Sequence, residues 1–258
     1  ITGPSIGMIA SLALTNPVLM PLMDNDWRSV LAIYAGVAAA AACVWLAISS
    51  HPEARRIERA LAAEPREPLL RVYGELLRLP TVRLMLALSV GVFFFNHGLN
   101  NWLPTLLRTR GLDPAAADLW AMTPTLVGIA GSLLIPRLAT PKRRIPILIA
   151  LLAAALMATL LLQSVPGPLL GTGLVLQGIA RSSLMTVSVL ILVELPEIGG
   201  RRAGAASGLF FSAAEIGGLN RPLALGAISE ATGGFDLALY ALSGMMIALT
   251  LIATRLRR

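Results

Sequence analysis

The sequence predicts an all-α polytopic membrane protein with eight transmembrane helices. The chain is 56% hydrophobic and only 14% charged, and its mean hydropathy is +0.75. A hydrocarbon core of about 30 Å needs about 20 consecutive, mostly apolar residues in a helix. Such runs fill the sequence almost end to end and leave no stretch for a soluble domain: 2–23, 27–50, 82–107, 115–139, 145–165, 168–193, 203–229 and 235–254.

The placement of the basic residues predicts how these helices are oriented. Most of the 21 Lys and Arg residues follow the second, fourth, sixth and eighth runs. Connections rich in Lys and Arg stay in the cytoplasm, so both ends of the chain are expected there, in a bacterial inner membrane. The net charge of +7 therefore indicates orientation in a lipid bilayer and no nucleic-acid partner.

One long polar connection, 51–81, follows the second run. Pro65, Pro68 and Pro80 are expected to divide it into short helices on the cytoplasmic surface. Its apolar side chains recur at helical spacing and are expected to rest on the helix bundle, with no role in docking a partner: Leu69, Tyr73, Leu76 and Leu77.

An internal similarity predicts the domain organisation. Residues 31–35 match 237–241, so the first two runs echo the last two. Secondary transporters use parallel repeats of this kind, although coincidence is the alternative because the match is short. On this interpretation, 1–50 holds the last two helices of a first six-helix half, 51–81 is the linker, 82–258 is the second half, and four helices precede Ile1.

Charged residues at membrane depth are the first candidate site. Arg181 lies near the middle of the sixth run, Gln177 lies one turn earlier on the same face, and Glu215 lies at similar depth in the seventh run. Such residues are costly in a bilayer and usually face a bundle interior or an aqueous cavity. In one interpretation, Arg181 is the counter-charge for an anionic substrate, and Glu215 is either a proton site or the ionic partner of Arg181 when no substrate is bound. In the other, Arg181 and Glu215 form a structural ion pair that fixes helix packing.

The third run adds a group of polar side chains to this candidate site. Asn96, His97, Asn100 and Asn101 fall within six residues and form two polar faces of one helix. The asparagines suit a binding ledge or a gate. His97 could take part in proton coupling, because histidine titrates near neutral pH. Hydrogen bonding between helices is the alternative for all four.

Small residues are assigned to packing. Cys43 is the single cysteine, so an intramolecular disulfide and a cysteine-rich metal site are excluded. Gly204 and Gly208 are four residues apart, a spacing that permits close helix packing.

Two segments carry a family resemblance. The segment Asn96-His97-Gly98-Leu99-Asn100-Asn101-Trp102-Leu103-Pro104-Thr105 is similar to the end of helix seven in the cyanate and nitroimidazole type branch of the major facilitator superfamily. Asp26-Trp27-Arg28 resembles the start of helix six. The resemblance implies a truncated chain with helices five to twelve, in which the sixth run, as helix ten, lines the cavity.

The superfamily's Gly-Asp-Arg-Gly-Arg signature has a weaker copy between helices eight and nine. In this chain, that place keeps the basic cluster but has no acidic residue, and the cluster is the candidate gating loop on the cytoplasmic side: Arg137, Lys142, Arg143 and Arg144.

The residues and the resemblance together predict a secondary active transporter and no enzyme. Motifs for metalloprotease, diphosphate or nucleotide chemistry are absent from the sequence, so no metal or cofactor is expected. The expected partner is a small solute, either an organic or inorganic anion or a weakly polar molecule. A functional monomer would move it by alternating access, driven by a proton gradient, as in symport with protons, or by a solute gradient. The alternative is a polytopic membrane enzyme or a channel-like scaffold whose reactive residues precede Ile1.

Overall fold

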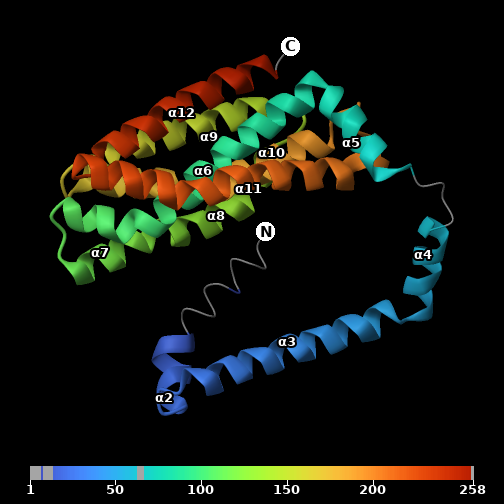
Figure 1. Ribbon diagram of the computed structural model, residues 1–258, viewed down its shortest axis with the longest axis horizontal. Coiled ribbons are helices and arrows are strands. Elements are labelled where there is room, and N and C mark those ends of the chain that lie inside the picture. The colour runs from blue at the N-terminus through green and yellow to red at the C-terminus, as the bar shows by residue number, and fades with distance from the viewer. Residues whose placement is uncertain (1–6, 8–13, 63–66, 257–258) are drawn as a thin grey trace. The chain divides into compact units, whose positions relative to one another are not determined.

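The computed structural model describes residues 7, 14–62 and 67–256 (Figure 1). Every element within these ranges is a helix. The chain divides into two compact units, Ile1–Pro68 and Leu69–Arg258, which we call unit 1 and unit 2 and describe separately.

Unit 1 contains a short π-helix η1 (Thr15–Leu19), α2 (Met20–Leu22), α3 (Trp27–Ser49) and α4 (Pro52–Ala62). The Asp26 carboxylate accepts hydrogen bonds from the backbone N–H groups of Arg28 at 3.1 Å and Ser29 at 3.2 Å. This N-cap satisfies donors that have no partner in the first turn of a helix. It explains why α3 begins at Trp27. Half of the first predicted run, 2–23, lies outside the described residues.

Unit 2 begins with two helices joined through Leu79, and six further helices follow. Asp113 caps α7, and Gly233 ends α11 in the left-handed conformation at φ 71°, which glycine adopts without steric cost. The helices are α5 (Leu69–Arg78), α6 (Pro80–Thr109), α7 (Pro114–Ala121), α8 (Thr123–Leu138), α9 (Arg144–Leu161), α10 (Pro168–Val193), α11 (Gly199–Thr232) and α12 (Asp236–Arg255).

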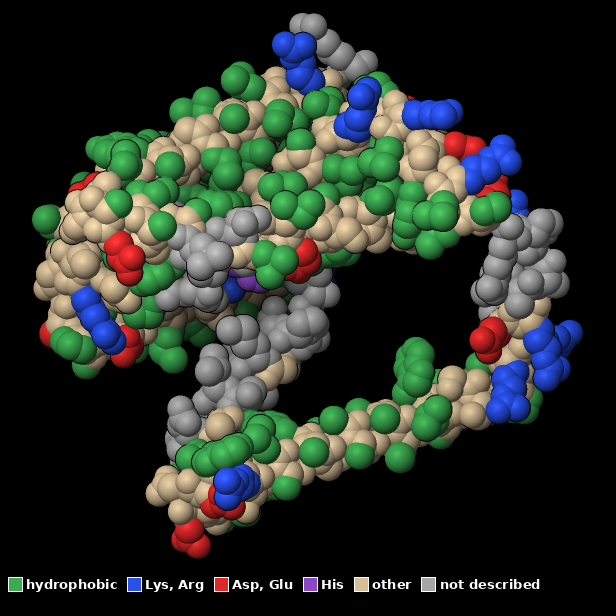
Figure 2. Space-filling model, in the orientation of Figure 1, with side chains coloured by type: hydrophobic (Ala, Val, Ile, Leu, Met, Phe, Trp, Pro, Cys, Tyr) green, Lys and Arg blue, Asp and Glu red, His purple; other side chains and the backbone are tan. Residues whose placement is uncertain are grey.

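Six segments of the described chain are long and apolar enough to cross a membrane, which confirms an all-helical, multi-pass architecture. They are Trp27–Ser49, Pro80–Leu99, Pro114–Leu138, Arg144–Leu161, Pro168–Val193 and Asp236–Arg255. The seventh predicted run lies within α11, a continuous helix that interrupts its apolar residues with charged ones. Figure 2 shows hydrophobic side chains spread over the outer surface of unit 2.

The helices of unit 2 pack around one apolar core. α6 contacts α10, α11 and α12, α10 contacts both α8 and α9, and α9 contacts α12 (Figure 1). Phe95, Met85 and Leu88 from α6 and Phe210 from α11 are among the large side chains that are fully buried there. The candidate site is built on the contacting helices α6, α10 and α11.

Glycines set the closest approaches between these helices. A Cβ atom at Gly217 of α11 would overlap the carbonyl oxygen of Val90 in α6. A Cβ at Gly178 of α10 would lie 2.5 Å from the carbonyl oxygen of Pro124 in α8. The expected close packing at Gly204 is not found within the described residues, since nothing lies within 4 Å of its Cβ position. Gly208 meets only the Tyr73 hydroxyl, at an ordinary 3.6 Å.

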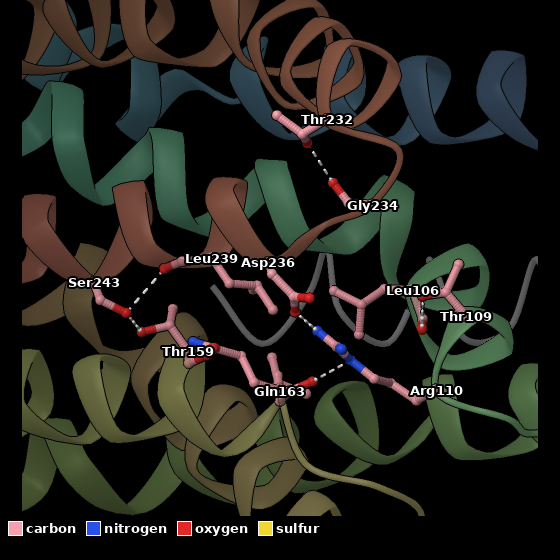
Figure 3. Close-up of polar contacts among 11 residues, drawn as sticks. Leu106, Thr109, Arg110, Thr159, Gln163, Thr232, Gly234, Asp236, Leu239 and Ser243 are labelled. Atoms are coloured by element: carbon pink, nitrogen blue, oxygen red, sulfur yellow. Dashed lines mark hydrogen bonds and ion pairs between the residues drawn. The ribbon is translucent and has the colours of Figure 1, made fainter.

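Arg110 joins three helix ends on one side of unit 2 (Figure 3). Its guanidinium contacts Asp236 at the start of α12 at 2.5 Å, and its Nε donates to the Leu162 carbonyl at the end of α9 at 3.1 Å. Deeper in the bundle, the hydroxyls of Thr159 in α9 and Ser243 in α12 lie 2.8 Å apart. These contacts hold α6, α9 and α12 together.

The opposite ends of the helices are tied by other ion pairs. Arg144 at the start of α9 pairs with Glu194 after α10, and its Nε donates to the Ala139 carbonyl at 3.1 Å. Glu75 of α5 pairs with Arg202 of α11 at 2.8 Å. α5 is therefore an attached part of unit 2.

The structure corrects one detail of the predicted connection 51–81. It contains two short helices, α4 and α5, as expected. The stripe of α5 that enters the core is Val72 and Leu76, whereas Leu69 and Leu77 are exposed. Leu76 is thus buried as expected and Tyr73 is half-buried, but packing against α6 and α11 buries Val72 beside them in place of Leu69 and Leu77.

We expect Gly217→Ala to destabilise unit 2, because the new methyl would overlap the Val90 backbone, which cannot move away like a flexible side chain. Overpacking of this kind costs about 1–3 kcal/mol. Gly244→Ala is the matched control on α12, since its Cβ position is open, and it should be neutral or stabilising. Thermal unfolding of both variants in detergent micelles is the measurement; equal midpoints for Gly217→Ala and the parent protein would contradict the close contact.

Candidate functional site

The candidate side chains come from three mutually contacting helices of unit 2. α6 contacts α10 and α11, and α10 also contacts α11. The third, sixth and seventh predicted runs, far apart in the sequence, are therefore neighbours in the bundle.

α10 places a charge in the middle of a membrane-spanning segment. Arg181 is 13 residues from Pro168 and 12 from Val193, which corresponds to about 18–20 Å of helix on either side. The Arg181 side chain is partly buried, and Gln177, one turn earlier, is 1% exposed. The side-chain Oε1 of Gln177 is buried without a hydrogen-bond partner among the described residues.

α6 contributes an amide and an imidazole. Asn96 is partly buried, and its Oδ1 also lacks a hydrogen-bond partner among the described residues. His97 is exposed, and its ring lies 5.4 Å from the ring of Phe93, one turn earlier. Asn100 and Asn101 belong to α6, but their side chains lie outside the described part of the structure.

α11 presents an acidic and aromatic edge. Glu215 is exposed and lies one turn after Phe211. The Phe211 ring contacts Phe93 of α6, with centroids 6.2 Å apart, and Phe210, with centroids 5.6 Å apart. His97 and Glu215 each follow by one turn an aromatic residue of a cluster shared by α6 and α11, whereas Arg181 and Gln177 are less exposed on α10.

The predicted gating loop lies between α8 and α9, and its basic residues differ in their surroundings. Arg137, Lys142 and Arg143 are exposed. Arg144 is partly buried and forms the ion pair with Glu194. Arg144, the last residue of this basic cluster, thus anchors the loop to the end of α10. α10 is also the helix that carries Arg181.

Sequence reasoning missed three partners. The pairing of Arg144 with Glu194 and of Arg202 with Glu75 joins residues far apart in the sequence, for which no spacing rule exists. The stacking of Phe93 on His97 could have been found, since residues four apart on a helix are neighbours. No group of three or more His, Cys, Asp or Glu side chains that could hold a metal ion occurs among the described residues.

The comparisons with known proteins give one result. The family model described as Major Facilitator Superfamily matches residues 1–220. No curated protein matches the chain. The match covers most of the sequence, including α6, α10 and the part of α11 that carries Glu215, and it does not favour a membrane enzyme or a channel-like scaffold. This multi-pass membrane protein therefore belongs to the major facilitator superfamily, a family of secondary transporters.

Proposed function

We propose that this protein transports a small anion across the bacterial inner membrane by alternating access, with Arg181 as the counter-charge. The partly buried position of Arg181 at mid-depth of α10 carries the proposal. Insertion of an arginine at a helix centre costs about 2.5–3.5 kcal/mol. A compensating anion recovers part of this cost each time it binds, which gives the site selectivity for charge.

The unpartnered acceptors narrow the class of solute. The Oδ1 of Asn96 and the Oε1 of Gln177 are buried, and neither has a hydrogen-bond partner among the described residues. A buried acceptor without a partner is costly, and a solute N–H or O–H group would satisfy it. We therefore infer a small anion that also carries a hydrogen-bond donor, such as a hydroxy or amino acid or a protonated oxyanion.

The exposed residues His97 and Glu215 are the proposed coupling groups. Both are on helices that contact α10, and both can change charge by binding a proton. In this mechanism Glu215 is protonated while the anion occupies Arg181, and the carboxylate balances Arg181 when the site is empty. This mechanism is symport, because a proton on Glu215 and the anion at Arg181 bind and leave together.

The basic end of unit 2 supports a cytoplasmic position for the loop from Arg137 to Arg144 and for both chain ends, by the positive-inside rule. The resemblance of Asn96–Thr105 to the cyanate-type branch favours small inorganic and organic anions as first candidates. The proposed unit of function is a monomer that works by alternating access about the candidate site.

Arg181→Ala should abolish uptake without reducing the amount of inserted protein, because the counter-charge is lost. Arg181→Lys, the matched control, keeps the charge but loses the planar guanidinium and should retain part of the uptake. The measurement is uptake of labelled cyanate, formate, nitrite and lactate into cells. Normal uptake by Arg181→Ala contradicts an anion site, and loss of inserted protein in Arg181→Ala alone indicates a structural ion pair.

Glu215→Gln should stop accumulation against a concentration gradient but leave downhill exchange, because a neutral amide cannot carry the coupled proton. Glu230→Gln is the control, an exposed acid nearer the end of the same helix, and it should behave like the parent. The measurement is solute accumulation in proteoliposomes with an imposed proton gradient. Continued uphill accumulation by Glu215→Gln would rule out coupling at this residue.

Gln177→Met should weaken solute uptake without lowering the free energy of unfolding, because it removes an acceptor that has no partner within the described part of the chain. Thr159→Val, whose hydroxyl contacts Ser243, is the control for a partnered polar group and should lose about 0.6–1.7 kcal/mol. Unfolding in micelles and uptake are measured together. If Gln177→Met destabilises as much as Thr159→Val, the amide has a structural role.

A further inference from the structure

α5 exposes apolar side chains although it lies outside the six candidate membrane spans. Leu70 is 85% exposed, the highest fraction for a large hydrophobic side chain among the described residues, and Leu77 is 43% exposed. Single exposed leucines are common on protein surfaces. Leu69 is 56% exposed as well, and three exposed leucines on one short helix next to a membrane span indicate a surface that is covered by something apolar.

The sequence of α5 divides the helix into three faces. Leu70 and Leu77 are seven residues apart and therefore point within about 20° of each other. Arg71 and Arg78 form a second pair with the same spacing, about 100° around the helix from the leucines. Val72 and Leu76 form the third face, which is buried in the core of unit 2 at 5% and 0% exposure.

Contacts with α11 fix the rotation of α5 about its axis. The Glu75 carboxylate accepts a hydrogen bond from Arg71 at 3.0 Å and pairs with Arg202 of α11 at 2.8 Å. The hydrogen bond from Arg71, together with the charge of Arg202, lowers the pKa of Glu75, so the carboxylate stays ionised at neutral pH. The Leu70–Leu77 strip is thereby held facing away from the bundle.

The position of α5 brings this strip to the membrane surface. Leu77 lies three residues before Pro80, the first residue of a candidate span. α5 lies at one end of the bundle (Figure 1), where Figure 2 shows hydrophobic, basic and acidic side chains next to one another. A helix with an apolar strip beside basic residues is typical of helices that lie in the plane of the lipid headgroups.

We propose that α5 is an interfacial helix whose Leu70–Leu77 strip inserts into the adjacent leaflet while Arg71 and Arg78 bind anionic phospholipid headgroups. Arg71 and Arg78, which lie beside the Leu70–Leu77 strip, are both basic. Their charge makes this face of α5 complementary to an anionic surface. An arginine near such a surface contributes about 1 kcal/mol. Lipid binding at α5 then anchors unit 2 at this interface, independently of any transported solute.

The single cysteine makes the test simple. In a Cys43→Ala background, we would place one cysteine at Leu70 and, as a matched control, at Thr140, an exposed residue of the loop between α8 and α9. Each is labelled with an environment-sensitive fluorophore in proteoliposomes of phosphatidylcholine, alone or in an equal mixture with phosphatidylglycerol. The label at Leu70 should be blue-shifted and quenched by lipids with spin-labelled chains, whereas the label at Thr140 should be quenched by aqueous iodide.

The charge dependence is tested with Arg78→Gln, which leaves the Glu75 contacts in place. In anionic vesicles this variant should lower the ratio of lipid-quenched to iodide-quenched label at Leu70 by up to about fivefold, which corresponds to ~1 kcal/mol. Arg143→Gln, which removes another exposed arginine, should leave the ratio unchanged.

Three outcomes would overturn the proposal. Quenching of the Leu70 label by iodide alone means that the strip faces water. Protection from both quenchers means that a protein segment covers it. An unchanged ratio in Arg78→Gln, or equal ratios in the two lipid compositions, removes the role of anionic headgroups.

Discussion

The close contact between α6 and α11 is the constraint on which the candidate site depends. Gly217 allows the α11 backbone to approach the Val90 carbonyl of α6 to a distance that no larger residue permits. Farther along the same pair of helices, the rings of Phe93 and Phe211 meet. Both helices also contact α10, which carries Arg181.

Charge in unit 2 is organised by depth. Ion pairs of Arg110 with Asp236 and of Arg144 with Glu194 tie helix ends together, where water and headgroups can solvate them. The deep positions hold a few polar groups, such as Thr159 with Ser243, whose hydroxyls satisfy each other. Gln177 and Asn96 differ, since each keeps a buried acceptor without a partner among the described residues. That difference is the reason why we propose Gln177 and Asn96, and not Thr159 or Ser243, as contacts for a solute.

α5 takes part both in core packing and in an ion pair at the end of the bundle. One of its faces belongs to the core, and its Glu75 is held by Arg202 of α11, the helix that also carries Glu215. A lipid-bound α5 would therefore hold one end of α11 at the membrane surface. Unit 2 would then move relative to the bilayer as a body that includes α5, while the candidate site lies farther along the same helix.

The sequence by itself determined the all-helical, multi-pass class and the approximate bounds of the six apolar spans, because run length and hydropathy are local properties. The sequence assigned the candidate residues to helices that the structure contains. It did not predict which face of each helix packs against its neighbours. Spacing did not show that α5 buries Val72 in place of Leu77, that Gly217 rather than Gly204 packs closely, or that Glu194 meets Arg144. In a mostly apolar helix, every face can be buried at similar cost, so only packing against distant segments decided which side chains are buried, paired or left open.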